Sequence, residues 1–526
     1  MKVQLIHPPV YLNVHAMTAL RPSVPLGLAY VAASLREAGH AVSILDAVGE
    51  APDQVSPGLR PQLFQLGLTP DQIVDRIDPG ADALGITNMW SFSWPLVREI
   101  VRRVKARFPD KPLVAGGEHF TGLPEMSMEQ SPVDVVVLGE GEEGAVEVFA
   151  ALARQRAGES VDWAAIPGIC YRGPDGRPVR SLQVRARRKD VDAIPWPAWD
   201  LIKVDVYNEY DFVNGIKKGK TVPILATRGC PYQCTYCSSP NMWTTRWYPR
   251  DPKDVVDEIE HYHRTLGATN FPFQDLTAIV KKEWIVAFCN ELLARRLDIQ
   301  WQFPSGTRCE VVDDEVASLL YRTGGRSLAF APESGSERTR KLIRKQMKTD
   351  SLLDAVRSSV RHRLNVTAFI VIGFPHDEAS DLKETARLAR QLARLGIDDI
   401  AVGFFFPIPN THLYRELMAR GRLSLNDDSL LTPIFANEEK LLAENNYCDH
   451  LSHRQLTRWK YRILWNFYAT SFALRPWRVA QILWNALRGR ETRKLETFLV
   501  DLRRKAGIAI RERFGRRKPA KQPATA

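Results

Sequence analysis

The chain has 526 residues, 44% of them hydrophobic and 25% charged, which is enough for about three or four domains with sizeable cores. Its seven cysteines are odd in number and mostly isolated, a pattern that excludes a disulfide framework and favours a reducing cytoplasm. The N-terminus enters a strand-like segment without the apolar core of a signal peptide, and no window of about 18 uninterrupted apolar residues suits a membrane-spanning helix. We therefore expect a cytoplasmic protein.

The first 150 residues alternate between strand-like apolar runs and amphipathic helical patterns. The strand-like runs are 3–6, 41–45, 83–86, 113–115 and 133–138, and the helical patterns are 26–38, 95–108 and 142–153. This alternation predicts an α/β fold, a doubly wound Rossmann-like sheet with helices on both faces. Ligands of such sheets bind beyond the carboxyl ends of the strands. The candidate ligand-binding residues at those ends are Thr87, Gly116, Gly117, Gly139 and Glu140.

No G-x-G-x-x-G motif follows the first strand of this unit, which disfavours a nicotinamide or flavin domain. Residues 151–215 connect it to a second unit. Within this connection, the sequence of residues 167–176 predicts a small hairpin with a Pro-Asp-Gly turn. Residues 194–200 are stiffened by prolines, and we expect them to lie extended across both units.

Residues 216–425 repeat a strand–helix pattern about six times. The strand-like runs are 223–227, 270–274, 299–303, 327–331, 366–372 and 399–406, and the helical patterns are 253–266, 282–295, 314–322, 336–343, 352–362 and 382–395. Consecutive right-handed βα units predict a partial (β/α)6 barrel. Functional groups in such barrels come from the carboxyl ends of the strands.

Three cysteines follow the first strand of this barrel, in the run Arg-Gly-Cys-Pro-Tyr-Gln-Cys-Thr-Tyr-Cys. They are Cys230, Cys234 and Cys237. Thiolates this close on a loop can converge on an iron–sulfur cluster, and three ligands leave one iron of a cubane open for a small molecule. Structural zinc is the alternative, but it prefers four closed ligands, and the other cysteines are scattered singly.

The C-terminal region, residues 426–526, predicts helices and a basic tail. Residues 475–521 hold 15 Lys and Arg against four Asp and Glu, a difference of +11 that equals the formal net charge of the chain. An aromatic amphipathic stretch overlaps the start of this tail. Its members are Trp465, Phe467, Tyr468, Phe472, Trp477 and Trp484. Tryptophan beside arginine suits an interfacial membrane helix, and the alternative is a docked helical subdomain with an aromatic core.

The cysteine spacing resembles the CxxxCxxC signature of the radical S-adenosylmethionine (SAM) family, in which the open iron chelates SAM and cleaves it reductively. The first domain adds the Pro-Leu-Gly-Leu-Ala-Tyr run at 25–30 and the Gly-Glu-Gly-Glu run at 139–142. With these motifs, residues 1–425 are similar to the cobalamin-dependent radical SAM enzymes. The resemblance implies a cobalamin-binding domain at 1–150, a radical SAM barrel at 216–425, and three cofactors: a [4Fe–4S] cluster, SAM and cobalamin.

This sequence departs from methionine-synthase-like cobalamin domains because it lacks Asp-x-His-x-x-Gly, the motif that supplies a histidine to cobalt. We therefore expect a corrinoid without a protein imidazole on cobalt. His7, His15 and His119 are the histidines near the ligand edge, although an isolated histidine is more often structural. A degenerate domain that no longer binds cobalamin is the alternative.

Polar residues at the other barrel strand ends match a zwitterionic ligand such as SAM. Arg308 suits the SAM carboxylate, Asp275 its ammonium, and Glu333 its ribose hydroxyls or ammonium. The resemblance adds Ser334 of an E-S-G-S turn, Gly373 for close approach of adenine, and Tyr236 beside adenine. For each of these residues the alternative is a helix cap or turn role.

The resemblance implies a C-methyltransferase acting on an unactivated carbon through a 5′-deoxyadenosyl radical and methylcobalamin. The alternative is a radical SAM oxidative cyclase, or an enzyme that forms a carbon skeleton, on a lipid or tetrapyrrole without methyl transfer. No acid–base catalytic residue is identified. A methylthiotransferase is disfavoured because only Cys170 precedes the motif, so we expect no nucleic-acid partner. The expected partners are a small-molecule or lipid-like substrate, a ferredoxin- or flavodoxin-type electron donor, and the inner face of a membrane as a peripheral contact.

Overall fold

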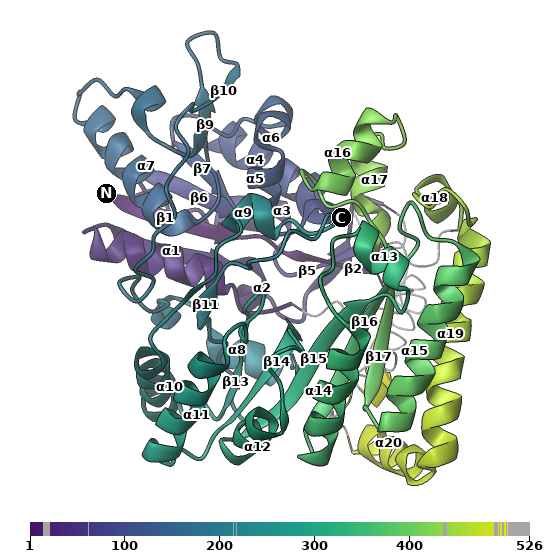
Figure 1. Cartoon of the computed structure of the whole chain (residues 1–526). Coiled ribbons are helices and arrows are strands. Elements are labelled where there is room, and N and C mark those ends of the chain that lie inside the picture. The colour runs from purple at the N-terminus through teal and green to yellow at the C-terminus, as the bar shows by residue number, and fades with distance from the viewer. Residues whose placement is uncertain are drawn as a thin grey trace, which may run out of the picture.

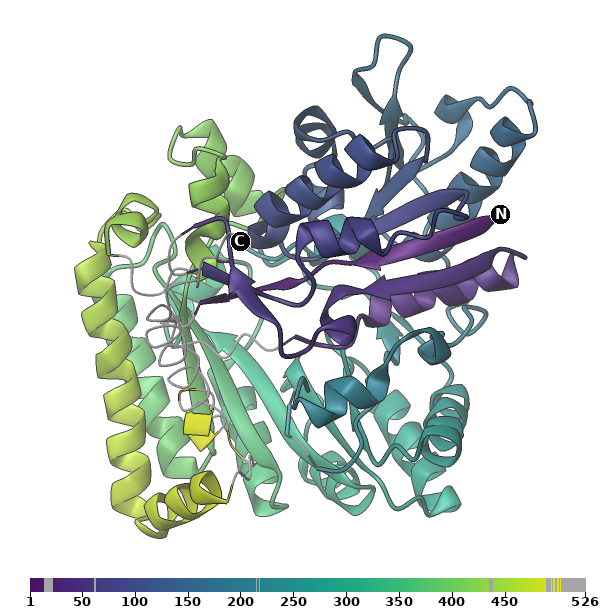
Figure 2. The same cartoon turned by 180° about the vertical axis from the view of Figure 1, so that it is seen from behind.

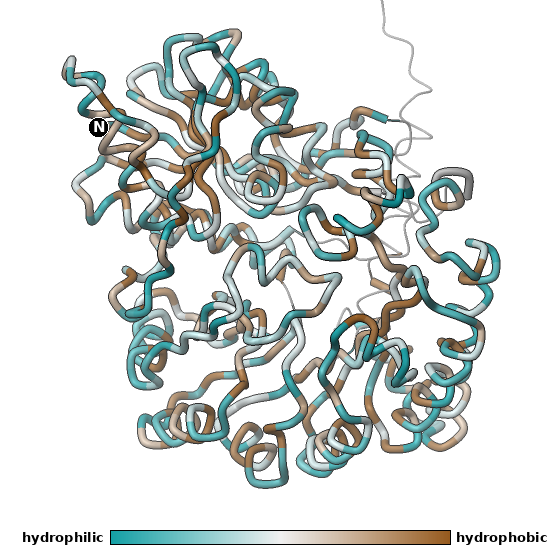
Figure 3. Tube along the Cα trace, turned by 45° about the horizontal axis from the view of Figure 1, so that its top comes forward, coloured by the Kyte–Doolittle hydropathy of each residue, from teal (hydrophilic) through white to brown (hydrophobic). Residues whose placement is uncertain are grey.

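A computed structural model describes residues 1–13, 22–60, 63–213, 215–216, 218–434 and 439–488, and a few positions between 493 and 502. An N-terminal α/β domain lies against a second α/β domain, and C-terminal helices flank the second (Figures 1 and 2). Both domains have apolar strands buried beneath helices of mixed hydropathy (Figure 3). The predicted order of a doubly wound domain, a partial barrel and a helical region is confirmed.

The first domain is built on a seven-stranded sheet in the order β10-β9-β8-β7-β6-β1-β3. Its five parallel strands are β1 (Lys2–His7), β3 (Ala41–Asp46), β6 (Ala83–Thr87), β7 (Leu113–Gly116) and β8 (Val135–Val137). The predicted hairpin is present as β9 (Ile169–Arg172) and β10 (Pro178–Arg180), and it extends this sheet antiparallel to β8.

Helices cover both faces of this sheet. One core contains apolar residues of α1 (Leu26–Glu37) and α7 (Gly141–Arg156), and the other those of α4 (Trp94–Arg107). The smaller helical elements are α2 (Ala47–Glu50), α3 (Pro70–Asp75), η1 (Ser91–Ser93), α5 (Glu118–Gly122), α6 (Pro124–Gln130) and η2 (Trp163–Ala165). A three-stranded antiparallel sheet that the sequence did not predict consists of β2 (Val10–Asn13), β5 (Leu63–Leu66) and β4 (Val55–Pro57).

The connection between the domains is ordered by contacts with each of them. Trp196 packs against His261 of the barrel with ring centroids 5.5 Å apart, while the Ala198 amide donates to the Ala29 carbonyl of the first domain. The connection also contains η3 (Trp199–Leu201) and α8 (Val204–Glu209). The prediction that 194–200 spans both domains is confirmed.

The barrel contains a five-stranded parallel sheet in the order β13-β14-β15-β16-β17. The strands are β13 (Asn270–Pro272), β14 (Gln300–Thr307), β15 (Gly325–Glu333), β16 (Asn365–Ile372) and β17 (Asp399–Phe404). The intervening helices are α10 (Pro252–Leu266), α11 (Lys282–Arg295), α12 (Asp314–Arg322), α13 (Glu337–Leu342), α14 (Thr349–Arg361) and α15 (Ala379–Leu395).

The predicted first barrel strand, 223–227, is less regular than its neighbours. Isolated bridges join Thr221 to Asn270 and Ile224 to Phe273, so the segment lies parallel to β13 without a continuous ladder. Pro223 has no N–H to donate to such a ladder. The following residues instead form β11 (Thr227–Arg228), which pairs antiparallel with β12 (Tyr248–Pro249) after the short helix α9 (Ser239–Trp243).

The C-terminal region is helical, as predicted. It follows α16 (His412–Ala419), and its elements are α17 (Asp427–Leu431), η4 (Thr432–Ile434), α18 (Glu439–Glu444), α19 (His453–Leu474) and α20 (Trp477–Leu487). Helix α19 packs along α15 and β17. Within the described residues, no helix combines the length and apolarity needed to cross a bilayer. Most of the predicted basic tail lies outside the described residues.

Candidate functional site

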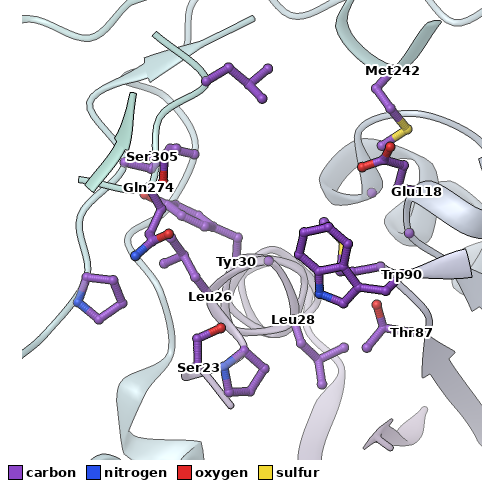
Figure 4. A pocket seen from close by; sticks show the side chains of 18 of the residues that line it. Ser23, Leu26, Leu28, Tyr30, Thr87, Trp90, Glu118, Met242, Gln274 and Ser305 are labelled. Atoms are coloured by element: carbon purple, nitrogen blue, oxygen red, sulfur yellow. The ribbon is translucent and has the colours of Figure 1, made fainter. Parts of the chain in front are cut away.

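A large cavity of about 810 Å³ lies between the first domain and the barrel. This volume is near the upper end of the roughly 300–1,000 Å³ typical of ligand pockets. Leu26, Leu28 and Tyr30 of α1 line it from the first domain, and Gln274 and Ser305 line it from the barrel (Figure 4). The carboxyl ends of both sets of parallel strands therefore face one shared space.

Each first-domain residue predicted to bind a ligand lines this cavity. They are Thr87, Gly116, Gly117, Gly139 and Glu140. Gly117 has φ +109°, and a Cβ there would lie 2.6 Å from the Asn88 carbonyl oxygen, so only glycine suits this turn. Gly27, which also lines the cavity, has no atom within 4 Å of an added Cβ. Its backbone is therefore open to a ligand.

Glu140 lines the cavity, but its carboxylate is engaged by the protein. Arg187 donates to it at 2.8 Å, and Arg228, directly before the cysteine loop, lies 3.4 Å away. Arg228 also pairs with Glu142 at 2.7 Å and lies over the Tyr30 ring at 4.9 Å. These buried ion pairs bind the Gly-Glu-Gly-Glu loop to the cysteine loop, so Glu140 joins the two domains.

The three candidate histidines have different surroundings. His7 lines the cavity, and its Nδ1 lies 2.7 Å from Asp46 Oδ1, which also accepts from the Tyr207 hydroxyl at 3.0 Å. His119 is buried between Ser91 and Ser127 and stacks on a tryptophan, and burial lowers its pKa to about 3. His119 is thus a packed core residue that does not line the cavity, and His15 lies outside the described residues.

Asp275 lines the cavity from the barrel and is nearly inaccessible to solvent. Its carboxylate accepts from Thr227 Oγ1 at 2.6 Å and from the Ala226 amide at 3.2 Å. Burial raises the pKa of Asp275 to about 6, although these hydrogen bonds lower it. In this structure the carboxyl group therefore holds the segment that leads into the cysteine loop.

Arg308 and Tyr232 form a second contact between a strand end and the cysteine loop. The guanidinium carbon lies 3.9 Å from the centre of the Tyr232 ring, a cation–π contact. Arg308 also donates to both carboxylate oxygens of Glu310, at 3.0 and 2.5 Å. The guanidinium is therefore fixed at the cavity wall beside the loop.

Glu333 forms the third contact and has the unusual φ of +62°. It accepts from the Tyr236 hydroxyl at 2.8 Å and from Lys345 Nζ at 3.3 Å, and all three residues line the cavity. Burial and the neighbouring carboxylate raise the pKa of Tyr236 well above its usual value. Lys345 follows the short helix α13 and belongs to no motif, so the sequence pattern does not predict its place at the cavity.

Two predicted ligand-binding residues, Ser334 and Gly373, do not line this cavity. Ser334 Oγ lies 3.1 Å from Thr385 Oγ1 and accepts from the Ser336 amide, so it holds its own turn. Ala331 and Glu333 at the end of β15 both line the cavity, so the alternation of side chains along a strand directs Ser334 away from it. A Cβ on Gly373 would lie 2.9 Å from Leu456 of α19, so this glycine allows close helix packing. For both residues the structure supports the alternative turn or packing role.

Cys230, Cys234 and Cys237 all line the cavity. Burial, with a smaller contribution from the other two thiols, raises the pKa of the Cys237 thiol to about 12. Among the described residues, no three His, Cys, Asp or Glu side chains are gathered around one metal-ion position. A cubane cluster does not require its three thiolates to meet at one metal-ion position, because each thiolate binds a different iron. Three thiols around an open cavity therefore fit a cluster better than a closed tetrahedral zinc site.

Buried polar atoms without a partner also line the cavity from both domains. They are Asn88 Nδ2, Ser239 Oγ, Thr277 Oγ1 and Thr307 Oγ1, none of which has a hydrogen-bond partner among the described residues. Each unsatisfied buried group costs about 1–3 kcal/mol. They fit large polar ligands that contact both domains at once, as amide-bearing cobalamin and SAM would.

Comparisons with known families identify both halves of this arrangement. Residues 14–149 match the model of the B12 binding domain, and residues 224–389 match that of the radical SAM superfamily. The two matches include the first-domain and barrel strand ends that line the shared cavity.

Curated relatives cover most of the chain at low identity. An uncharacterized methyltransferase of Pyrococcus horikoshii is 28% identical over 80% of this chain and 84% of its own length. Cytidylyl-2-hydroxyethylphosphonate methyltransferase of Streptomyces wedmorensis is 27% identical, over 80% and 82%. Anaerobic magnesium-protoporphyrin IX monomethyl ester cyclase of Synechocystis is 29% identical, over 74% and 72%.

Two solved structures share the fold. The radical SAM methyltransferase TsrM of Kitasatospora setae, solved with cobalamin and a [4Fe–4S] cluster, has a TM-score of 0.59 at 18% identity, covering 80% of this chain and 78% of its own. The cobalamin-dependent radical SAM enzyme OxsB, with aqua-cobalamin and SAM bound, has a TM-score of 0.64 at 13% identity, covering 98% and 80%. At these identities the likeness concerns the fold.

Proposed function

The chain belongs to the cobalamin-dependent radical SAM enzymes, and from that premise we propose that it is a C-methyltransferase acting on an unactivated carbon. One observation carries the proposal. The three cysteines and the open first-domain strand ends face a single cavity, so a cluster and a corrinoid bound there would act on one substrate. Two of the relatives are named methyltransferases.

The bound cofactors supply the difficult chemistry, namely a carbon-centred radical from SAM and a methyl group carried by cobalamin. The residues of this chain position those cofactors. Cys230, Cys234 and Cys237 would hold the cluster, and Asp275, Arg308 and Glu333 keep the cysteine loop in place through Thr227, Tyr232 and Tyr236. Lys345 and Arg308 place positive charge on the same wall, where a SAM carboxylate would be stabilised.

We also propose a hydrophobic or lipid-like small-molecule substrate. Met89, Trp90 and Leu276 line the cavity yet remain 50%, 62% and 45% exposed. Apolar side chains that stay exposed beside a cavity mark a binding surface more often than apolar side chains scattered over the protein surface do. An apolar substrate would cover all three residues as it enters.

The proposed setting is the cytoplasm, with a ferredoxin- or flavodoxin-type protein delivering the electron that SAM cleavage requires. Peripheral contact with the inner face of the membrane is part of this proposal. The chain offers a specific surface for that contact on α20.

The decisive experiment is anaerobic incubation of the reconstituted protein with methyl-labelled SAM, a reductant and a lipid extract, read by mass spectrometry. A methyltransferase of this kind releases equal amounts of 5′-deoxyadenosine and S-adenosylhomocysteine and a labelled product. Because one of the relatives is named a cyclase, oxidative cyclisation is the competing activity to be tested. A cyclase would release 5′-deoxyadenosine and an unlabelled product, and that outcome would reject methyl transfer.

A further inference from the structure

Helix α20 differs from an ordinary surface helix, because Arg478 and Asn485 lie beside Ile482 on its buried side while most of its apolar side chains are exposed. Arg478 and Asn485 are 8% and 7% exposed, whereas Trp477 and Trp484 are 63% and 54% exposed. Surface helices normally direct their apolar stripe toward the core. The core of this protein therefore does not explain the apolar side of α20.

The buried polar side fixes α20 to the barrel. The two terminal nitrogens of Arg478 donate to the carbonyls of Ile397 and Gly396, each at 2.7 Å, and Asn485 donates to Glu496 at 2.8 Å. Arg475 donates to the Ala393 carbonyl at 3.0 Å. These bonds set the rotation of the helix, so the exposure of its tryptophans follows from the fold.

The exposed side of α20, together with the last residue of α19, is here named the α20 face. Its members are Leu474, Trp477, Val479, Leu483, Trp484 and Leu487, which are 52%, 63%, 41%, 56%, 54% and 80% exposed. Residues 477 and 484 are two turns apart on one stripe, and 483 and 487 are one turn apart on the adjacent stripe. The guanidinium of Arg488 lies 4.0 Å from the centre of the Trp484 ring. The face thus combines aromatic and aliphatic side chains with a cation at its edge.

We propose that the α20 face docks on an anionic membrane surface. Tryptophan and leucine beside arginine are the side chains that enter the headgroup boundary of a bilayer. The charge of the surrounding sequence complements anionic lipid, because residues 475–521 carry the whole formal excess of +11. A helix that lies in the interface needs no spanning segment, in agreement with the described helices.

The α20 face lies at the opposite end of the barrel from the cavity. Arg478 contacts the residues just before β17, whereas the cavity is lined by carboxyl ends such as Thr307 of β14 and Glu333 of β15. Figures 1 and 2 both show α20 at the end of α19 remote from the first domain. The face is therefore an anchor rather than a substrate entrance. The inference rests on the membrane contact proposed above and is independent of methyl transfer.

The test is sedimentation of the full-length, cofactor-loaded chain with vesicles of phosphatidylglycerol and phosphatidylcholine, or of phosphatidylcholine alone. We expect binding to the anionic vesicles at low salt and release at high salt. The double variant Trp477→Ala/Trp484→Ala should bind at least about tenfold more weakly. Leu487→Glu should also weaken binding, whereas Leu182→Glu, the same change at a 98% exposed leucine of the first domain, should not.

Three outcomes would overturn the inference. The first is failure of the unmodified chain to bind anionic vesicles, and the second is equal binding by the double tryptophan variant, which would assign docking to basic residues alone. The third is concentration-dependent self-association that the same variants abolish, which would assign the face to a second copy of the chain. SAM cleavage and corrinoid absorbance, measured on the same preparations, separate failure of docking from failure of the proposed enzyme.

Discussion

The two walls of the cavity differ in how their charged and polar groups are held. On the barrel wall, charged groups are already paired: Asp275 with Thr227, Arg308 with Glu310, and Glu333 with Lys345. On the first-domain wall, Gly27 and Asn88 present open backbone and an unpartnered amide. The charged residues of the barrel wall are therefore held before a ligand binds. Thr277 and Thr307 of that wall nevertheless resemble Asn88 in having no side-chain partner among the described residues, and Glu140 of the first-domain wall is already paired. Variants on the two walls should accordingly lose different properties.

The largest effect is expected at the cysteine loop. Changing Cys230, Cys234 and Cys237 together to alanine should remove bound iron and sulfide, which in the reconstituted protein should reach about four of each per chain. Corrinoid binding should persist, because its proposed contacts lie on the other wall. Iron and sulfide assays with the corrinoid spectrum measure both. A full cluster in the triple variant would refute the ligand assignment.

The next effect concerns the paired charges of the barrel wall. Glu333→Gln leaves the Lys345 ammonium buried without its partner, and breaking such a pair costs about 3–5 kcal/mol. We expect lower stability in denaturant titration and weaker retention of the cluster, since Tyr236 loses its anchor. Glu337→Gln, the same change at an exposed position of α13, is the matched control. Equal stability of the two variants would show that Glu333 does not hold the loop.

A smaller effect distinguishes two glycines of the first-domain wall. Gly117→Ala should cost about 1–3 kcal/mol or more, because alanine is strained at φ +109° and its Cβ would clash with the Asn88 carbonyl. Gly27→Ala should leave stability equal or higher, since alanine favours helix α1, yet its methyl group would enter the cavity and weaken corrinoid binding. Thermal unfolding and corrinoid titration separate the two. If Gly27→Ala bound corrinoid with undiminished affinity, α1 would not be part of the corrinoid-binding wall.

Asp275 should add a pH dependence to stability. Burial raises its pKa from 3.8 to about 6, so its contribution is present below about pH 4 and is lost as pH rises through 6. Asp275→Asn should therefore unfold with a flatter pH profile between 4 and 7 than the unmodified chain. Denaturant midpoints across this range provide the measurement. Parallel profiles would mean that Asp275 does not titrate as a buried acid.

The smallest expected effect is at His7. We propose that cobalt carries no protein imidazole, so the electron paramagnetic resonance spectrum of the cobalt(II) form should lack nitrogen superhyperfine splitting. His7→Gln should therefore leave that spectrum unchanged. The variant is informative because the contact of Nδ1 with Asp46 leaves the Nε2 atom of His7 able to bind a metal. Splitting that disappears in His7→Gln would instead identify His7 as a cobalt ligand.

The sequence predicted the strands and helices of both domains well, because apolar periodicity reports burial directly. It also predicted that Asp275, Arg308 and Glu333 lie at the cavity. It could not show which neighbours they contact. Ser334 lies on the side opposite to Glu333 because side chains alternate along a strand, which the resemblance to an E-S-G-S turn does not take into account. Lys345 belongs to no motif, and only the fold brings it to Glu333. For the aromatic C-terminal stretch, the interpretation as an interfacial helix and the interpretation as a docked core each hold in part. Phe467 is buried in the core, whereas Trp477 and Trp484 are exposed.

The central claim is that one cavity holds the cluster and the corrinoid together. Electron paramagnetic resonance of the protein with a reduced cluster and cobalt(II) tests it most directly. The account predicts that the cobalt(II) signal is broadened or split by the nearby cluster spin, and that Cys230→Ala/Cys234→Ala/Cys237→Ala restores the unperturbed signal. Two independent, additive spectra from fully loaded protein would contradict it, because the two cofactors would then occupy separate sites.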